Sequence, residues 1–346
     1  NEGRFGPDCP QGVMLPLTIL NLMVLAPLTA FQDTSTCICM HSLKPADIAR
    51  WVRSERVGHF ASVPTVIQDL LTAEEVDPGD LATLGQPDIG GAGIARSFQA
   101  LYRERFGQRM TVAYGMTEAP TIVARTEGDT EPQEELCGRA VLQVALEVVD
   151  GNDHSLPPGE VGEICVRPAR VGPYAGVYTP MLGYWNRPQE TRAALRNGLY
   201  HSGDLGYLDA ACQLFIRGRL KELIIRGGAN IYPAEIERAL ATHADVADSA
   251  VLGVPDARLG QRVVAAVQLH PQHAAFAAEE AARELAAALQ AHCAQQIARY
   301  KVPAQIVFVR ALPRNAMNKV VKPQLLPLFD ATGNLLPPQG ASSEDS

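Results

Sequence analysis

The hydrophobic pattern in the first part of the chain predicts helices that alternate with a strand. Apolar residues recur at helical spacing between 45 and 52, and Pro45 suits the first turn of a helix. A short apolar run at 59–63 then predicts a strand, and Pro64 opens a second helix through residues 66–71. Strand and helix in alternation indicate an α/β layer.

The pattern changes after Gly138, where short β-rich runs predominate. These runs span residues 141–149, 161–166 and 213–217, and turn residues at 157–159 separate two of them. We therefore predict a β-rich subdomain in this part of the chain.

A third pattern follows Gly228 and predicts a compact α+β domain. Its expected elements are a helix at 233–240, strands at 247–254 and 263–269, an alanine-rich helix at about 275–298 and a strand at 305–309. The tail at 331–346 has too few apolar residues to fold, so we expect it to be flexible.

Residues 13–30 are apolar enough to raise the question of a membrane span. Pro16, Asn21 and Pro27 interrupt the stretch, and no secretory signal pattern accompanies it. We predict a buried helix and no membrane span.

Length and composition predict a globular protein with two domains. The chain has 346 residues, of which 47% are hydrophobic and 20% are charged. Its net charge of -8 has the wrong sign for gripping a phosphate backbone, which argues against nucleic acid as a partner. The seven cysteines form no CxxC pair, and their odd number indicates a reducing, cytoplasmic compartment.

The sharpest local signal is the run YGMTE at 114–118, which follows a predicted strand at 110–113. A glycine lets the backbone approach a ligand, a threonine hydroxyl can donate to phosphate, and a carboxylate can hold Mg²⁺. The alternative is a turn followed by a helix cap.

Four further motifs surround this run in order. They are DIGGAG at 88–93, YHSGDLG at 200–206, RGRLKELIIRGGANIYPAEIE at 217–237, and the closing pair YKVP at 300–303 with LPRNAMNKV at 312–320. Together they resemble the adenylate-forming superfamily of AMP-forming acyl-CoA synthetases, luciferases and peptide-synthetase adenylation domains, over residues 15–326.

The resemblance implies a mixed α/β and α+β fold. Residues 1–220 would form the C-terminal part of a large AMP-binding domain, with its βα layer and β-rich subdomain. Residues 221–330 would form a small mobile α+β domain after a hinge at Lys221, and 331–346 a flexible tail.

It also implies a nucleotide site in the large domain. Gly90, Gly91 and Ala92 would line the seam between adenine and the acyl pocket. Tyr114 would stack on adenine, beside Gly115 and Met116. Thr117 would contact the α-phosphate, and Glu118 would hold Mg²⁺. Asp204 would receive both ribose hydroxyls, a role in which a carboxylate makes two charge-assisted hydrogen bonds, with Arg219 nearby. Taken singly, Asp204 could instead belong to a surface turn, and Arg219 and Lys221 to a solvated strand.

In the small domain, the resemblance implies that Gly227 and Gly228 border the pantetheine tunnel and that Lys319 is the catalytic lysine of adenylation. Asn318 stands where the family usually has glycine, and asparagine is the residue that best tolerates the backbone glycine would adopt. The neighbouring Lys322 is the alternative candidate for the lysine.

One family motif is missing. A loop rich in Ser, Thr and Gly that ends in Lys-Gly should precede the apolar stretch, and residues 10–12 match it only superficially. We expect the first portion of the enzyme to be absent, in which case the chain alone would be inactive in adenylation.

The predicted function is a carboxylate–CoA ligase that uses ATP and Mg²⁺ to form acyl-AMP and then transfers the acyl group to CoA. Its partners would be a small carboxylic acid, ATP and CoA, with a homodimer left open. Two alternatives remain: an adenylating enzyme that loads a carrier-protein pantetheine, and a non-catalytic nucleotide-binding remnant.

Overall fold

The computed structural model describes residues 5–14, 26–85, 87–90, 96–107, 110–119, 121–127, 130, 133, 135–270, 279–315 and 319–329. The chain divides into two compact units, Asn1–Ile216 (unit 1) and Arg217–Ser346 (unit 2). The sequence placed the boundary at 220–221, and the tail expected at 331–346 lies outside the described residues.

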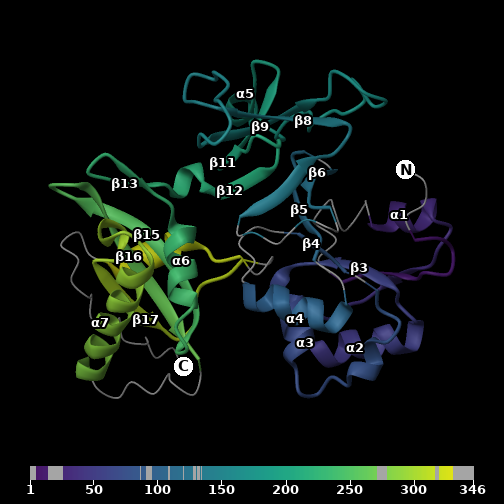
Figure 1. Cartoon of the computed structure of the whole chain (residues 1–346), viewed down its shortest axis with the longest axis horizontal. Coiled ribbons are helices and arrows are strands. Elements are labelled where there is room, and N and C mark those ends of the chain that lie inside the picture. Colours follow the sequence, from purple (N-terminus) through teal and green to yellow (C-terminus); the bar gives the residue numbers. More distant parts are fainter. Residues whose placement is uncertain are drawn as a thin grey trace, which may run out of the picture. The chain divides into compact units, whose positions relative to one another are not determined.

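The described strands of unit 1 and its border with unit 2 form a 12-stranded sheet (Figure 1). Its parallel part runs in the order β2 (Cys37–Cys39), β1 (Gln11–Val13), β3 (His59–Ser62), β4 (Asp88–Gly90), β5 (Val112–Met116). It continues through β6 (Thr121–Arg125), β7 (Leu136–Ala140), β12 (Leu214–Arg219), β11 (Leu199–Leu208), β9 (Gly162–Pro168) and β8 (Val144–Val149), while β10 (Leu195–Arg196) pairs with β11. The pairs β5–β6, β6–β7, β7–β12, β9–β11 and β8–β9 are antiparallel, so the predicted α/β layer followed by a β-rich subdomain is confirmed.

Helices cover the parallel strands because their apolar positions fall on one face. Among the described residues, the helices of unit 1 are α1 (Ala26–Gln32), α2 (Pro45–Glu55), α3 (Pro64–Thr72), α4 (Arg96–Phe106), α5 (Pro188–Ala194) and the 3-10 helix η2 (Pro78–Leu81). In α2, Pro45 occupies the first turn, and Ile48 and Val52 are fully buried one turn apart. These side chains share one core with residues of α3, α4, β3 and β4.

The prediction of a buried helix over 13–30 is wrong at its start. Val13 is the last residue of β1, where it pairs with Cys39 of β2, and the helix α1 begins only at Ala26. Residues 15–25 lie outside the described part. Among the described residues, no helix is both long enough and apolar enough to span a membrane.

Unit 2 contains a five-stranded sheet with apolar residues on both faces. Its elements are η3 (Leu220–Glu222), β13 (Ile224–Arg226), β14 (Ala229–Ile231), α6 (Pro233–Ala241), β15 (Val246–Asp256), β16 (Gly260–Leu269), α7 (Glu279–Gln296), η5 (Arg299–Lys301), β17 (Gln305–Val309) and η6 (Lys322–Leu328). Alternate residues of β16 belong to two cores: Val263 and Ala265 pack with α6 and α7, and Val264 and Ala266 pack with Leu325 of η6. This explains the continuous apolar run in its sequence.

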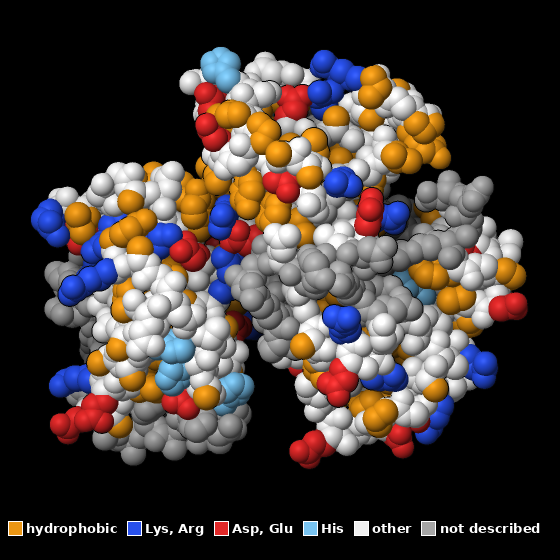
Figure 2. All heavy atoms as spheres, viewed as in Figure 1, with side chains coloured by type: hydrophobic (Ala, Val, Ile, Leu, Met, Phe, Trp, Pro, Cys, Tyr) orange, Lys and Arg blue, Asp and Glu red, His pale blue; other side chains and the backbone are white. Residues whose placement is uncertain are grey.

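Acidic and basic side chains are interspersed on the visible face of each unit (Figure 2). All seven cysteines are free thiols.

Candidate active site

Two predicted nucleotide contacts lie where the parallel pairing of β4 with β5 ends. β4 ends at Gly90, which pairs with Ala113 of β5, and Tyr114 is the next residue of β5. Gly90 is exposed, and a Cβ built there would meet none of the described atoms within 4 Å. Open parallel sheets bind ligands at this edge. Gly91 and Ala92 lie outside the described residues.

A tight turn presents the threonine and glutamate of the YGMTE run. Gly115 and Met116 complete β5, and a bridge between Met116 and Ala119 closes a turn at Thr117 and Glu118. The strand β6 follows this turn, so the alternative of a helix cap is wrong. Thr117 is exposed and Glu118 is half-buried, which leaves both side chains accessible at the edge of the sheet.

The segment between β9 and α5 reaches this turn and fixes the glutamate. Tyr184 Oη donates a hydrogen bond to Glu118 Oε1 at 3.0 Å, and the backbone N–H of Met181 donates to the Glu118 carbonyl at 2.8 Å. Sequence reasoning missed Tyr184, because the two residues that meet are 66 positions apart.

Asp204 lies beside Tyr114. The Tyr114 hydroxyl donates to Asp204 Oδ2 at 2.7 Å, and the carboxylate residue is only 6% exposed within β11. The alternative that Asp204 belongs to a surface turn is therefore wrong. The structure joins two of the sequence motifs, 90 residues apart, through one buried hydrogen bond.

A bulge in β11 sets the direction of Asp204. In the register of β9 with β11, the three residues 202–204 face only Ile164. Gly203 adopts a φ of 70°, which favours glycine, and Asp204 follows it. Bulges next to active sites re-aim side chains.

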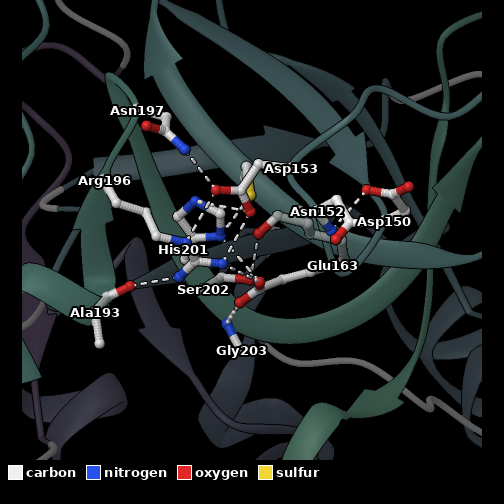
Figure 3. A network of polar contacts seen from close by, with 12 residues as sticks. Asp150, Asn152, Asp153, Glu163, Ala193, Arg196, Asn197, His201, Ser202 and Gly203 are labelled. Atoms are coloured by element: carbon white, nitrogen blue, oxygen red, sulfur yellow. Dashed lines mark hydrogen bonds and ion pairs between the residues drawn. The ribbon is translucent and has the colours of Figure 1, made fainter.

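A polar network adjoins the bulge (Figure 3); it consists of the buried His201 and the partly buried Asp153, Glu163 and Arg196. His201 Nδ1 lies 2.9 Å from Glu163 Oε2, and two guanidinium nitrogens of Arg196 donate to Asp153 at 3.0 Å each. The hydrogen bond from Arg196 lowers the pKa of Asp153, and Asp153 in turn raises the pKa of Arg196. Sequence reasoning assigned none of these four a role.

Glu163, Cys165 and His201 also offer metal-ligand atoms within 4.8 Å of one another. Arg196 Nη2 lies 3.6 Å from Glu163 Oε2, so its positive charge opposes a cation there. Burial raises the pKa of the Cys165 thiol to about 12. The arrangement favours a polar network over a metal centre.

The hydrogen bond between Tyr114 and Asp204 predicts a stability difference between two tyrosines of one core. Tyr114→Phe should lower the free energy of unfolding by about 1.5 kcal/mol, because a buried carboxylate loses a donor. Tyr178 packs in the same core, but its buried hydroxyl has no hydrogen-bond partner among the described residues. Tyr178→Phe should therefore cause no loss. Urea unfolding of both variants checks this, and equal losses would contradict it.

The predicted residues at the start of unit 2 are exposed. Arg219 is the last residue of β12, and Lys221 lies in the short helix η3. Gly227 and Gly228 form the two-residue tip of the β13–β14 hairpin, with φ angles of 57° and 84°. A two-residue hairpin with both φ angles positive favours glycine at each position.

The two candidate lysines near the C-terminus differ in their surroundings. Lys322 Nζ lies 2.7 Å from Glu222 Oε2 and 2.9 Å from Glu237 Oε1, and its side chain is 17% exposed. Burial lowers the pKa of Lys322, but Glu237 and Glu222 more than offset this, so the pKa lies above its usual value. Lys319 is exposed, and no described residue pairs with its ammonium group. This difference favours Lys319 as the lysine available to a ligand.

Comparison with known proteins identifies the family. The model of the AMP-binding enzyme family matches residues 6–185, and that of the AMP-binding enzyme C-terminal domain matches residues 235–319. The chain belongs to the AMP-binding enzymes. The first match lies within unit 1 and the second within unit 2.

Two relatives illustrate the range of proteins to which the chain is similar. A fatty acid–[acyl-carrier-protein] ligase of Streptomyces coeruleorubidus is 31% identical over 86% of this chain and 55% of its own length. A sulfoacetate–CoA ligase of Cupriavidus necator is 34% identical over 94% of this chain and 60% of its own length. The chain thus spans little more than half the length of these relatives.

A solved ATP-bound structure shares the fold. The crystal structure of ATP-bound MatB from Rhodopseudomonas palustris superposes with a TM-score of 0.79 at 28% identity, over 94% of this chain and 61% of that protein.

Proposed function

We propose that this chain carries the AMP-binding part of an acid–thiol ligase, which joins a carboxylic acid to AMP and then passes the acyl group to CoA. In the first step a carboxylate oxygen attacks the α-phosphorus of ATP and pyrophosphate leaves. In the second, the CoA thiol loses its proton, its sulfur attacks the acyl carbon, and AMP leaves. Relatives that include CoA ligases support this activity.

The observation that carries the proposal is the hydrogen bond between Tyr114 and Asp204 at the sheet edge. Tyr114 is proposed to stack on adenine, and Asp204 to accept the ribose hydroxyls. A carboxylate offers about four acceptor sites, so the bond from Tyr114 does not exhaust Asp204. The open backbone at Gly90, with Gly91 and Ala92, would line the seam towards the acyl group.

The turn after β5 suits the phosphate end of this site. Thr117 is proposed to donate to the α-phosphate, with Gly115 and Met116 beside it. Glu118 would hold Mg²⁺ together with phosphate oxygens, because carboxylate oxygen is a ligand that this ion prefers. The ion would neutralise charge that develops on the phosphoryl oxygens. Tyr184 positions Glu118 through its hydrogen bond to Oε1.

The remaining assignments lie in unit 2. Lys319 is proposed to supply the cation that stabilises adenylation, Arg219 to contact ribose or phosphate, and Lys221 to serve as the hinge. Gly227 and Gly228, at the exposed hairpin tip, are proposed to border the pantetheine arm of CoA. Seven free thiols support a cytoplasmic setting.

A carrier-protein pantetheine is the second candidate acceptor. The fatty acid–[acyl-carrier-protein] ligase among the relatives favours it, and both acceptors present the same thiol chemistry.

ATP–pyrophosphate exchange tests the proposal, with the protein in its natural length and a broad panel of carboxylic acids. We expect exchange that depends on one class of acid and that falls in Asp204→Asn, which keeps the shape of the side chain and removes its charge. Absence of exchange with every acid would reject the ligase and leave a nucleotide-binding remnant. Replacing CoA by a phosphopantetheinylated carrier protein then decides the acceptor.

A further inference from the structure

Side-chain hydrogen bonds hold the bulge that carries Asp204. The Gly203 backbone N–H donates to Glu163 Oε1 at 3.0 Å, and Ser202 Oγ donates to the Ile164 carbonyl at 2.6 Å. The Asp204 N–H in turn donates to Ser202 Oγ at 3.0 Å. Because residues 202–204 face a single residue of β9, the regular ladder is interrupted here, and these bonds replace it.

Glu163 is the one charged side chain among these contacts, and it is itself fixed. Its Oε2 lies 2.9 Å from His201 Nδ1 and 3.6 Å from Arg196 Nη2, while its Oε1 receives the Gly203 N–H. The carboxylate side chain is 12% exposed and that of His201 only 2%. A glutamate held at both oxygens keeps a single rotamer, so its position can determine the backbone at Gly203.

The far side of the network is anchored as well (Figure 3). Arg196 grips Asp153 with two hydrogen bonds of 3.0 Å, and Asn197 Nδ2 donates to Asp153 Oδ2 at 2.7 Å. Asp153 Oδ1 lies 3.8 Å from His201 Nε2. Arg196 and His201 are thus placed between two carboxylates, which keeps both of them directed towards Glu163.

We propose that Glu163 is a positioning residue for nucleotide recognition: it fixes the bulge at Gly203 and thereby aims Asp204 at the ribose. The inference rests on the proposed function, because it takes Asp204 as the ribose contact. The carboxylate of Glu163 does not touch the nucleotide. It acts only through the backbone of the residue that precedes Asp204.

Comparing two nucleotides separates this role from general support of the fold. AMP offers Asp204 two ribose hydroxyls, whereas 2′,3′-dideoxy-AMP offers none. Titration calorimetry should show that the wild-type protein binds AMP more tightly than dideoxy-AMP. Glu163→Ala should weaken AMP binding about tenfold, the loss of one charge-assisted hydrogen bond, and leave dideoxy-AMP binding unchanged. Glu163→Gln, which keeps an acceptor oxygen for Gly203, should recover part of the loss.

Glu147→Ala is the matched control. Glu147 lies on the neighbouring strand β8 and pairs with Arg167 of β9, so the variant removes an ion pair of the same sheet without touching the bulge. It should bind both nucleotides as wild type does.

The outcomes distinguish the inference from the function on which it rests. If the wild-type protein bound AMP no more tightly than dideoxy-AMP, Asp204 would not be the ribose contact, and the proposed function would be rejected with it. The positioning role alone would be overturned if Glu163→Ala kept the wild-type preference for AMP. It would also be overturned if the variant lost the same factor of affinity for AMP and for dideoxy-AMP. If Glu163→Ala does not fold, Glu163→Asp replaces it, since it withdraws the carboxylate by one methylene and carries the same expectation.

Discussion

In the protein in its natural length, replacing Lys319 by alanine is expected to lower the rate of acyl-AMP formation about 100-fold or more, the usual effect of removing one group that stabilises transition-state charge. The side chain is exposed, and no described residue pairs with its ammonium group, so the fold should not depend on it. Thiolation of acyl-AMP supplied directly should stay near the wild-type rate. Pyrophosphate exchange and thioester formation measure the two steps separately.

Arg310→Ala is a suitable control for this experiment, because Arg310 is another exposed cation of unit 2. Its removal should leave both half-reactions unchanged. If Lys319→Ala slowed both half-reactions equally, Lys319 would not be the adenylation lysine.

Replacing Lys322 by methionine is expected to destabilise unit 2 by about 3 kcal/mol, because it leaves Glu222 and Glu237 close together without their shared cation. The pKa of Lys322 is raised in the folded state, so its contribution is complete at pH 7 and is lost only as the pH rises through that raised pKa. Urea unfolding at pH 7 measures the effect.

The matched control is Lys319→Met, the same substitution three residues away on an exposed side chain. It should leave the free energy of unfolding unchanged. Comparable losses in the two variants would show that the ion pairs of Lys322 contribute nothing particular to unit 2.

Local pattern predicted much of the fold. The helices α2, α3 and α6 were expected because a proline opens each and apolar residues recur at helical spacing behind it. The strands β15, β16 and β17 were expected from their apolar runs. Such signals lie within a dozen residues, so the sequence carries them without reference to the rest of the chain. The prediction of a helix over residues 13–30 was wrong at its start, because Val13 pairs with the strand β2 and this pairing overrides the local apolar pattern.

The sequence by itself determined the order of the motifs, and hence the family and the candidate site residues; their individual roles remain proposals. Only the tertiary structure decided that Asp204 is a buried strand residue bonded to Tyr114, and that Glu163 holds the bulge before it. It also separated two chemically identical lysines, since Lys322 meets Glu222 from 100 residues away while Lys319 stays exposed. The physical reason is that strand register, bulges and buried ion pairs depend on contacts between distant segments, which no local run of residues encodes.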